Sequence, residues 1–134
     1  MSLGHWAVID IETTGINPGN DAIIDLGYYQ FEGTKLIKTF STLVRSEHPV
    51  SPYITKLTGI TNEQVMKAPV WEKAEGELLE LEKHSLIAHN AHFEESFLKK
   101  YFDKIEKNST YRESYQDSIL YFGLLFPEFS SLNL

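Results

Sequence analysis

The chain has 134 residues, which is enough for one domain with a sizeable core and short for two. Its 12 Lys and Arg against 19 Asp and Glu give a formal net charge of -7, which excludes a protein that holds nucleic acid mainly through clustered basic side chains. The absence of cysteine excludes disulfides, thiol nucleophiles and cysteine-bound metals, so any metal must have oxygen or imidazole ligands. With no apolar stretch long enough to span a bilayer and no leader pattern, we expect a soluble cytoplasmic protein.

Three strands are predicted in the first third of the chain. Residues 6–12 place β-branched residues between polar ends, which is typical of a buried strand, and residues 15–20 supply the Gly, Asn and Pro of a loop. Residues 23–31 and 35–44 are rich in β-branched and aromatic residues and flank a Glu-Gly turn. A hairpin after the first strand is therefore predicted.

Helices alternate with short strands in the remainder of the predicted structure. Residues 46–69 are irregular and interrupted by proline, although Thr61 and Gln64 form a capping-box signature at the start of a short helix. Apolar spacing predicts further helices at residues 71–81, 93–102 and 119–126, and strands at residues 85–88 and 111–117. The result is one α/β domain, residues 1–134, with a mixed sheet flanked by helices.

Two carboxylates stand near the end of the first predicted strand. Side chains alternate along a strand, so Asp10 and Glu12 share one face, about 7 Å apart, while Ile9 and Ile11 share the other. In open α/β sheets, ligands usually bind at the carboxyl ends of strands. The pair therefore marks a candidate site, and a solvated acidic strand end is the alternative.

A third carboxylate, Glu94, falls in the first turn of a predicted helix, where the helix dipole favours a negative charge. Glu94 shares a helix face with Leu98 and Tyr101, so it is expected to point inward more than Glu95 does. The alternative is a charge that only stabilises the start of the helix.

Three carboxylates that converge without thiols favour hard cations such as Mg²⁺ or Mn²⁺. A pair of such ions about 4 Å apart can activate water on one side of a phosphodiester and stabilise the leaving oxygen on the other. The sequence contains neither G-x-x-x-x-G-K-[ST] nor G-x-G-x-x-G, so a phosphate-binding glycine loop is not predicted.

Four strings in order resemble the DEDD exonuclease superfamily. They are Val-Ile-Asp-Ile-Glu-Thr-Thr-Gly at 8–15, Ile-Ile-Asp-Leu-Gly at 23–27, Leu-Thr-Gly-Ile-Thr at 57–61 and Ala-His-Asn-Ala-His-Phe-Glu at 88–94. Their order and spacing are most similar to the DnaQ-like DEDDh branch, which includes the proofreading epsilon subunit of bacterial DNA polymerase III and ribonuclease T.

This resemblance implies a ribonuclease H-like fold and removal of nucleoside 5'-monophosphates in the 3'-to-5' direction with two divalent ions, Mg²⁺ or Mn²⁺. By the same resemblance, Asp10 would bridge the metals, Glu12 would complete one metal site near the nucleophilic water, and Glu94 would take the place of the third carboxylate. The implied partners are nucleic-acid 3' ends, DNA or RNA, with a polymerase or another replication or repair protein as a candidate and no membrane.

The resemblance also assigns substrate-binding residues to two walls of the site. One wall would border the terminal nucleotide, with Thr13, Thr14, Gly15 and Ile16. The other would be shaped by His89, Asn90 and Phe93.

The chain departs from the family pattern at two points. The family has aspartate where this chain has Glu94, and no histidine followed five residues later by aspartate comes after Glu94. The family uses that pair as general base and last metal ligand, so we expect a C-terminally incomplete domain, the N-terminal portion of an exonuclease. General acid–base catalysis commonly contributes about 10² to 10⁴ in rate, so we expect this chain to be at least about 100-fold less active than a complete domain.

Other polar residues near these motifs are expected to have structural roles. His92 lies about 200° around the helix from Glu94, which makes it a poor general base. His89 is expected to hold the strand-to-helix turn through a hydrogen bond, and Asp117 is expected to be structural. Two other function classes remain open: a hydrolytically inactive nucleic-acid-binding or protein-interaction module of the same fold, and an unrelated carboxylate metal enzyme.

Overall fold

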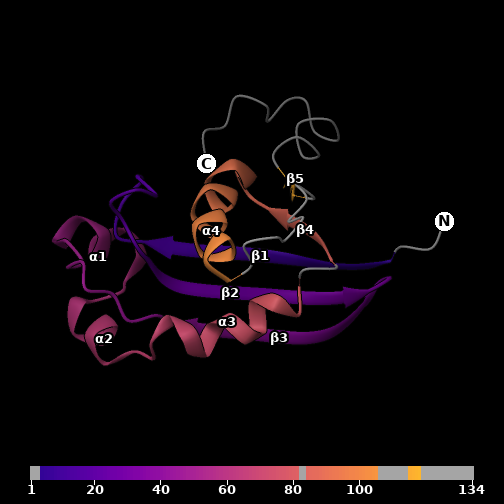
Figure 1. The fold of residues 1–134 in the computed structure, drawn as a ribbon, viewed down its shortest axis with the longest axis horizontal. Coiled ribbons are helices and arrows are strands. Elements are labelled where there is room, and N and C mark those ends of the chain that lie inside the picture. The colour runs from indigo at the N-terminus through magenta and orange to yellow at the C-terminus, as the bar shows by residue number, and fades with distance from the viewer. Residues whose placement is uncertain (1–3, 82–83, 106–114, 119–134) are drawn as a thin grey trace.

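The computed structural model describes residues 4–81, 84–105 and 115–118, and its strands form one five-stranded mixed sheet in the order β3-β2-β1-β4-β5 (Figure 1). Strands β1 (His5–Thr13), β2 (Ile23–Glu32) and β3 (Lys35–Leu43) pair antiparallel. Strands β4 (Ser85–Ala88) and β5 (Tyr115–Asp117) continue the sheet parallel to β1. The predicted mixed α/β sheet is confirmed.

The predicted hairpin between the second and third strands is also confirmed. Glu32 pairs with Lys35, which leaves a two-residue turn, and Gly33 in that turn has a φ of 59°. This left-handed backbone favours glycine because a side chain there would be strained. The indole N–H of Trp6 donates to the Gly33 carbonyl at 2.7 Å, which ties the turn to β1.

Helix α1 (Pro52–Thr58) lies where the sequence predicted only irregular structure, and that prediction is wrong. The Ser51 hydroxyl accepts from the Ile54 N–H at 3.2 Å, and Gly59 ends the helix with a φ of 79°. Pro52 does not interrupt this short helix, because proline is well tolerated in the first turn, where its missing N–H has no helical partner to lose.

The remaining helices follow the predicted pattern. Helix α2 (Asn62–Lys67) begins at the predicted capping box, in which Thr61 and Gln64 each accept the other's backbone N–H. Helices α3 (Trp71–Leu79) and α4 (Ala91–Ile105) correspond to the two amphipathic stretches. The predicted helix at residues 119–126 lies outside the described residues.

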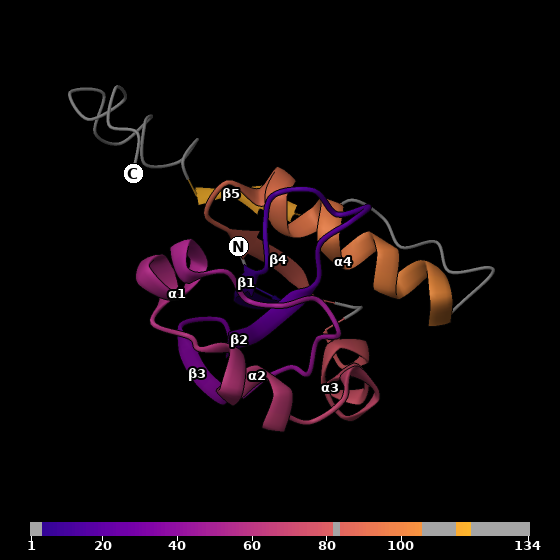
Figure 2. The ribbon, with the colours of Figure 1, turned by 90° about the vertical axis from the view of Figure 1, so that its left-hand side faces the viewer.

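The main core lies between the sheet and helices α3 and α4 (Figure 2). Its largest fully buried side chains come from both layers: Ile9, Ile23, Leu26, Tyr28, Leu78, Leu81, Phe97 and Leu98. A second, smaller cluster joins β2 to α1 and α2 through Ile24, Val50, Ile54 and Val65. Because side chains alternate along β1, the face opposite the main core carries Val8 and Asp10.

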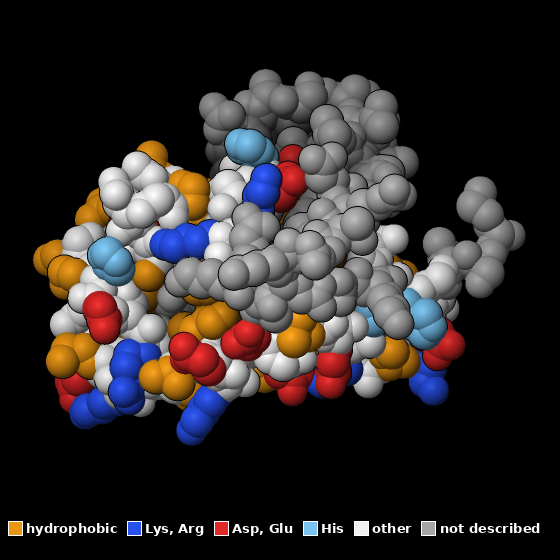
Figure 3. Space-filling view, viewed as in Figure 1, with side chains coloured by type: hydrophobic (Ala, Val, Ile, Leu, Met, Phe, Trp, Pro, Cys, Tyr) orange, Lys and Arg blue, Asp and Glu red, His pale blue; other side chains and the backbone are white. Residues whose placement is uncertain are grey.

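Charged side chains of both signs are interspersed over the part of the surface that Figure 3 shows, and its described Lys and Arg side chains form no single basic patch. None of the helices in residues 4–81, 84–105 and 115–118 is long and apolar enough to cross a membrane.

Candidate active site

The acidic residues singled out from the sequence lie at one edge of the sheet. Strands β1, β4 and β5 are parallel, so their carboxyl ends meet at this edge. Asp10 and Glu12 lie in the C-terminal half of strand β1. Glu94 lies in the first turn of helix α4, which follows β4, and Asp117 is the last residue of β5. The topology therefore gathers four carboxylates that are more than 100 residues apart at their sequence extremes.

The β1–β2 register adds a fifth carboxylate that sequence reasoning missed. Asp25 pairs directly with Glu12, so both side chains stand on the same face of the sheet. Burial raises the pKa of Glu12, and the negative charges of Asp10 and Asp25 raise it further. Burial also raises the pKa of Asp25. The hydrogen bond from the Leu26 N–H lowers this pKa, and the negative charge of Asp10 raises it.

The sequence contains part of the information that places Asp25 at this site. Asp25 lies in the string at residues 23–27 that carried the family resemblance, and strand alternation predicts its face only when the pairing register is known. That register depends on the conformation of the long β1–β2 loop, which no two-residue turn rule fixes.

Glu94 is the most buried of these acids, with 3% of its surface exposed. Its Oε2 has no hydrogen-bond partner among the described residues. Burial raises the pKa of Glu94 to about 7; its own backbone N–H opposes this shift, and the charges of Asp10, Asp117 and Glu12 reinforce it. The predicted inward orientation is confirmed, and the side chain is a buried acid with one oxygen that accepts no hydrogen bond from the part of the chain that the structure describes.

The carboxylates of Asp10, Glu12 and Glu94 provide the oxygen ligands that hard cations prefer. Repulsion from Asp10 raises the pKa of both Glu12 and Glu94, repulsion from Glu12 also raises that of Glu94, and a divalent cation would relieve this repulsion. Within residues 4–81, 84–105 and 115–118, however, no three His, Asp or Glu side chains are arranged to hold one ion. Mg²⁺ commonly uses only one or two carboxylates together with water and substrate phosphates, so the residues present fit such an ion without a complete protein cage.

The turn between β4 and α4 is held by the end of β5. The two carboxylate oxygens of Asp117 accept from the backbone N–H groups of Asn90 and Ala91, at 3.2 and 3.3 Å. Asn90 has a φ of 60°, a conformation that asparagine tolerates better than most residues. Nδ1 of His89 lies 3.1 Å from the Ser118 hydroxyl, so both His89 and Asp117 make the structural contacts expected of them.

The predicted substrate-binding residues lie on the two segments that flank this edge. Thr13 is buried, its hydroxyl donates to the Gly15 carbonyl, and the Thr14 hydroxyl also bonds within the same loop. Ile16 is 88% exposed at that loop's surface. On the other segment, His89 and Asn90 are exposed, and Phe93 is half-buried against Phe97, with ring centroids 5.0 Å apart.

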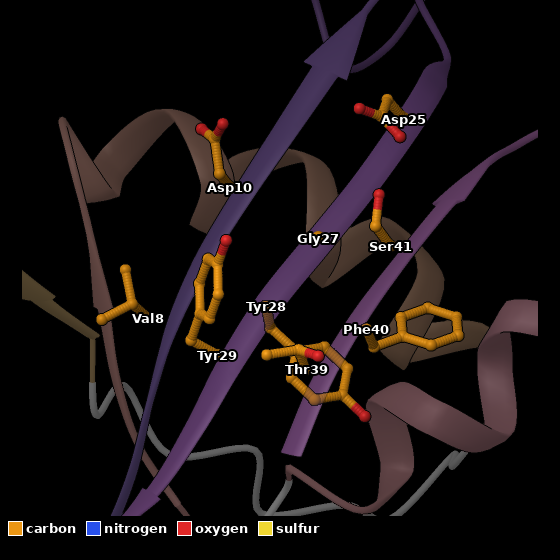
Figure 4. Close-up of a pocket in the computed structure, with 9 residues that line it drawn as sticks. All are labelled: Val8, Asp10, Asp25, Gly27, Tyr28, Tyr29, Thr39, Phe40 and Ser41. Atoms are coloured by element: carbon orange, nitrogen blue, oxygen red, sulfur yellow. The ribbon is translucent and has the colours of Figure 1, made fainter. Parts of the chain in front are cut away.

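A pocket of about 460 Å³ lies beside Asp10 on the face of β1–β3 that α3 and α4 leave open (Figure 4). Figure 4 shows the Tyr29 ring directed along this face toward Asp10, while Asp25 and Ser41 stand at the same end of the pocket. Gly27 forms part of its floor and contributes no side chain. The acidic edge therefore opens onto a hollow that is lined by both polar and apolar side chains and carries the exposed ring of Tyr29.

A family model described as exonuclease, RNase_T, matches residues 7–134 of the chain. The chain belongs to this exonuclease family.

Curated relatives of this exonuclease domain are much longer proteins. A DNA polymerase III PolC-type protein of Caldanaerobacter subterraneus is 44% identical over 97 residues, covering 72% of this chain and 7% of that protein. A "3'-5' exonuclease DinG" of Staphylococcus epidermidis is 30% identical over 136 residues, covering 100% of this chain and 15% of that protein. The chain thus spans a small part of the length of the curated relatives it matches.

Solved structures confirm that the exonuclease domain has the expected ribonuclease H-like fold. Exonuclease X in complex with 5' overhanging duplex DNA superposes with a TM-score of 0.69 at 23% identity, covering 91% of this chain and 64% of that one. Exonuclease I without ligand superposes with a TM-score of 0.75 at 15% identity, covering 93% of this chain and 32% of that one.

Proposed function

We propose that this domain is a metal-dependent 3'–5' exonuclease that hydrolyses the terminal phosphodiester of a nucleic acid and releases a nucleoside 5'-monophosphate. The observation that carries the proposal is the pairing of a buried Glu94, whose pKa is raised to about 7, with the exposed Asp10 at the carboxyl edge of β1. Family membership and a relative named as a 3'-5' exonuclease support the same activity.

Asp10, Glu12 and Glu94 are the proposed metal ligands and catalytic residues. Bound Mg²⁺ or Mn²⁺, in the two-ion arrangement, supplies a water of lowered pKa and neutralises charge on the leaving oxygen. Asp10 stands exposed at the pocket, where it can reach both a cation and a phosphate oxygen. Glu12, half-buried beside it, would orient the attacking water, and Glu94 would add the third carboxylate from its buried position in the first turn of α4.

The two segments that flank the carboxylates are the proposed walls for the terminal nucleotide. Thr13 to Ile16 would border one side of the nucleotide with backbone and the exposed Ile16 side chain. His89, Asn90 and Phe93 would shape the other side. Neither His89, which already contacts Ser118, nor the exposed His92 is proposed as the general base.

Nucleic-acid 3' ends are the proposed partner, and a polymerase is a candidate for a protein partner. A solved structural neighbour is a complex with DNA, and a curated relative is a polymerase of the PolC type. Both support a DNA substrate in a replication or repair setting, and an RNA substrate is the alternative that an assay separates.

A hydrolytically inactive module of the same fold is the second candidate. It is favoured by one observation: no three His, Asp or Glu side chains within the described segments are arranged to hold one ion. The longer side chain of Glu94, where the family resemblance has aspartate, points in the same direction.

The test of the activity is metal-dependent release of nucleoside 5'-monophosphates from a 3'-labelled single-stranded oligonucleotide, DNA and RNA in parallel. With excess enzyme and Mn²⁺ or Mg²⁺, we expect slow release by the wild-type chain and none by Asp10→Ala, because that substitution removes the ligand exposed to both cation and phosphate. Glu32→Ala, at the opposite end of β2, is the matched control and is expected to keep the wild-type rate.

Each other outcome has a defined meaning. If Asp10→Ala keeps the wild-type rate, the assignment of the metal site is wrong. If the wild-type chain binds the oligonucleotide in the presence of metal but releases nothing, the inactive module replaces the exonuclease as the conclusion.

A further inference from the structure

The loop that connects β1 to β2 is built around the carboxylate of Asp21. Oδ1 of Asp21 accepts from the Thr14 hydroxyl at 3.1 Å, and Oδ2 accepts from the Asn17 backbone N–H at 2.9 Å. Both oxygens are therefore engaged by donors of the loop itself. Asp21 is thus unlike the acids at the strand ends, whose carboxylates repel one another.

Gly15 lies against the Asp21 carboxylate, which occupies the space that a side chain at position 15 would need. A Cβ built on Gly15 would come 2.5 Å from Oδ2 of Asp21 and 2.7 Å from Oδ1. These separations are far shorter than any normal contact, so a side chain at position 15 would force the Asp21 carboxylate to move. Its backbone φ is not among the positive values found in the described residues, so the effect of a side chain at this position is one of space and not of backbone strain.

The loop is also fixed at its base and on its outer side. The Thr14 N–H donates to the Ala22 carbonyl at 2.9 Å, and the Ala22 N–H donates to the Thr14 hydroxyl at 3.0 Å. On the outer side, the Lys100 ammonium donates to the Pro18 carbonyl at 3.2 Å, which ties the loop to α4, the helix that carries Glu94. Ile16 is 88% exposed on the surface of this loop, whose backbone is fixed by hydrogen bonds inside the loop and by the contact with Lys100.

We propose that Asp21 is a positioning residue that sets the shape of the loop so that Gly15 and Ile16 form a binding surface for the 3'-terminal nucleotide. The inference rests on the proposed function, which places this loop beside that nucleotide. Asp21 acts only through the loop, because its two oxygens are occupied by Thr14 and Asn17 and its charge would repel a phosphate.

Removal of the carboxylate should weaken substrate binding much more than it slows the chemical step. For Asp21→Ala we expect KM for the oligonucleotide to rise about 10-fold or more while kcat changes less than about 3-fold, since a displacement of about 1 Å in a positioning element has large effects. Asp21→Asn can keep its oxygen as the acceptor for the Asn17 N–H, but its NH2 group can only donate to the Thr14 hydroxyl, which reverses that bond. Its KM should therefore fall between those of the wild type and Asp21→Ala. Glu63→Ala, on the exposed face of α2, is the control.

A double substitution tests whether Asp21 acts through Gly15. Gly15→Ala alone should raise KM because the new Cβ displaces the Asp21 carboxylate. Once that carboxylate is absent the clash disappears, so Gly15→Ala combined with Asp21→Ala should bind no more weakly than Asp21→Ala alone. Additive effects would overturn the proposed mechanism.

The outcomes separate this inference from the proposed function. Suppose that the wild-type chain releases nucleotides. If Asp21→Ala then leaves KM unchanged, or lowers kcat by as large a factor as it raises KM, the inference is wrong and the proposed exonuclease activity stands. If the wild-type chain releases none, the dissociation constant for an oligonucleotide with a free 3' hydroxyl replaces KM as the readout. In that case, a wild-type-like dissociation constant for Asp21→Ala, or no binding by the wild type, overturns the inference.

Discussion

Glu94 is buried, and one of its carboxylate oxygens lacks a hydrogen bond from the described residues, a costly combination. Only 3% of its surface is exposed, and its Oε2 lacks a hydrogen-bond partner within the described residues. An unsatisfied buried polar atom costs about 1–3 kcal/mol. The expected compensation is a cation at the strand ends, because a cation would pair with this oxygen and with the neighbouring acids.

This burial predicts a pH dependence of stability in the metal-free chain. The pKa of Glu94 is about 7 in the folded chain against 4.5 for the ordinary side chain, so the folded state binds the proton more tightly. The contribution of neutral Glu94 to the free energy of unfolding is therefore fully present below about pH 4.5 and is lost as the pH rises through about 7. Glu94→Gln, which stays neutral, should gain stability relative to wild type over this range, by at most about 3 kcal/mol.

Urea unfolding in EDTA at pH 4.5, 6 and 8 measures this difference. Glu95→Gln, one residue along α4, is the control of the same chemistry. Parallel pH curves for wild type and Glu94→Gln would contradict the buried-acid interpretation.

At the scale of single elements, helix α1 shows that end residues can decide a short helix. Ser51 and Gly59 cap its two ends, and Pro52 occupies the first turn. The helix matters for the site because Ile54 joins the cluster that holds β2 against α1 and α2. The irregular, proline-interrupted pattern of residues 46–69 rules out a long helix, whereas this short one depends on the cap that precedes its proline.

Two glycine substitutions give opposite effects that test this account. Gly59→Ala should destabilise the chain by about 1 kcal/mol, because alanine is strained at a φ of 79° although its Cβ would meet no atom within 4 Å. Gly76→Ala, inside α3 and equally free of contacts, should stabilise the chain by about 0.5–1 kcal/mol through helix propensity. Equal signs for the two changes in the free energy of unfolding would contradict the account of the α1 cap.

At the scale of the whole molecule, the acidic balance and the proposed substrate appear opposed, and the fold reconciles them. The net charge of -7 disfavours contact with a polyanion over a broad surface. The sheet concentrates carboxylates at one edge, where cations can join the protein to phosphate. Attraction for nucleic acid is therefore expected to depend on a divalent ion more than on Lys and Arg.

Binding measurements follow directly from this electrostatic arrangement. In EDTA, we expect weak binding of a fluorescent single-stranded oligonucleotide with little dependence on salt. With Ca²⁺, an oxygen-binding cation, fluorescence anisotropy should report affinity at least about 10-fold higher, and Asp10→Ala should remove most of this gain. Tight binding in EDTA with a steep salt dependence would instead indicate a basic surface.

Local patterns in the sequence were enough to predict the strands, the α2 capping box, and the inward orientation of Glu94. Alternation in β1 and helical spacing in α4 depend only on neighbouring residues, and the burial of Ile9, Ile11 and Leu98 agrees with them. The family resemblance supplied the ribonuclease H-like fold, which the solved structures confirm. The metal ligands and substrate contacts remain proposals.

Only the tertiary structure decided which distant side chains meet. Asp25 faces Glu12 because of the strand register, and Asp117 supports the β4–α4 turn because β5 lies beside β4. Asp21 supports Gly15 because the β1–β2 loop folds back on itself. Composition and periodicity record the preferences of each segment, whereas pKa shifts, shared pockets and loop shape arise from distances between segments, which are set when the chain packs.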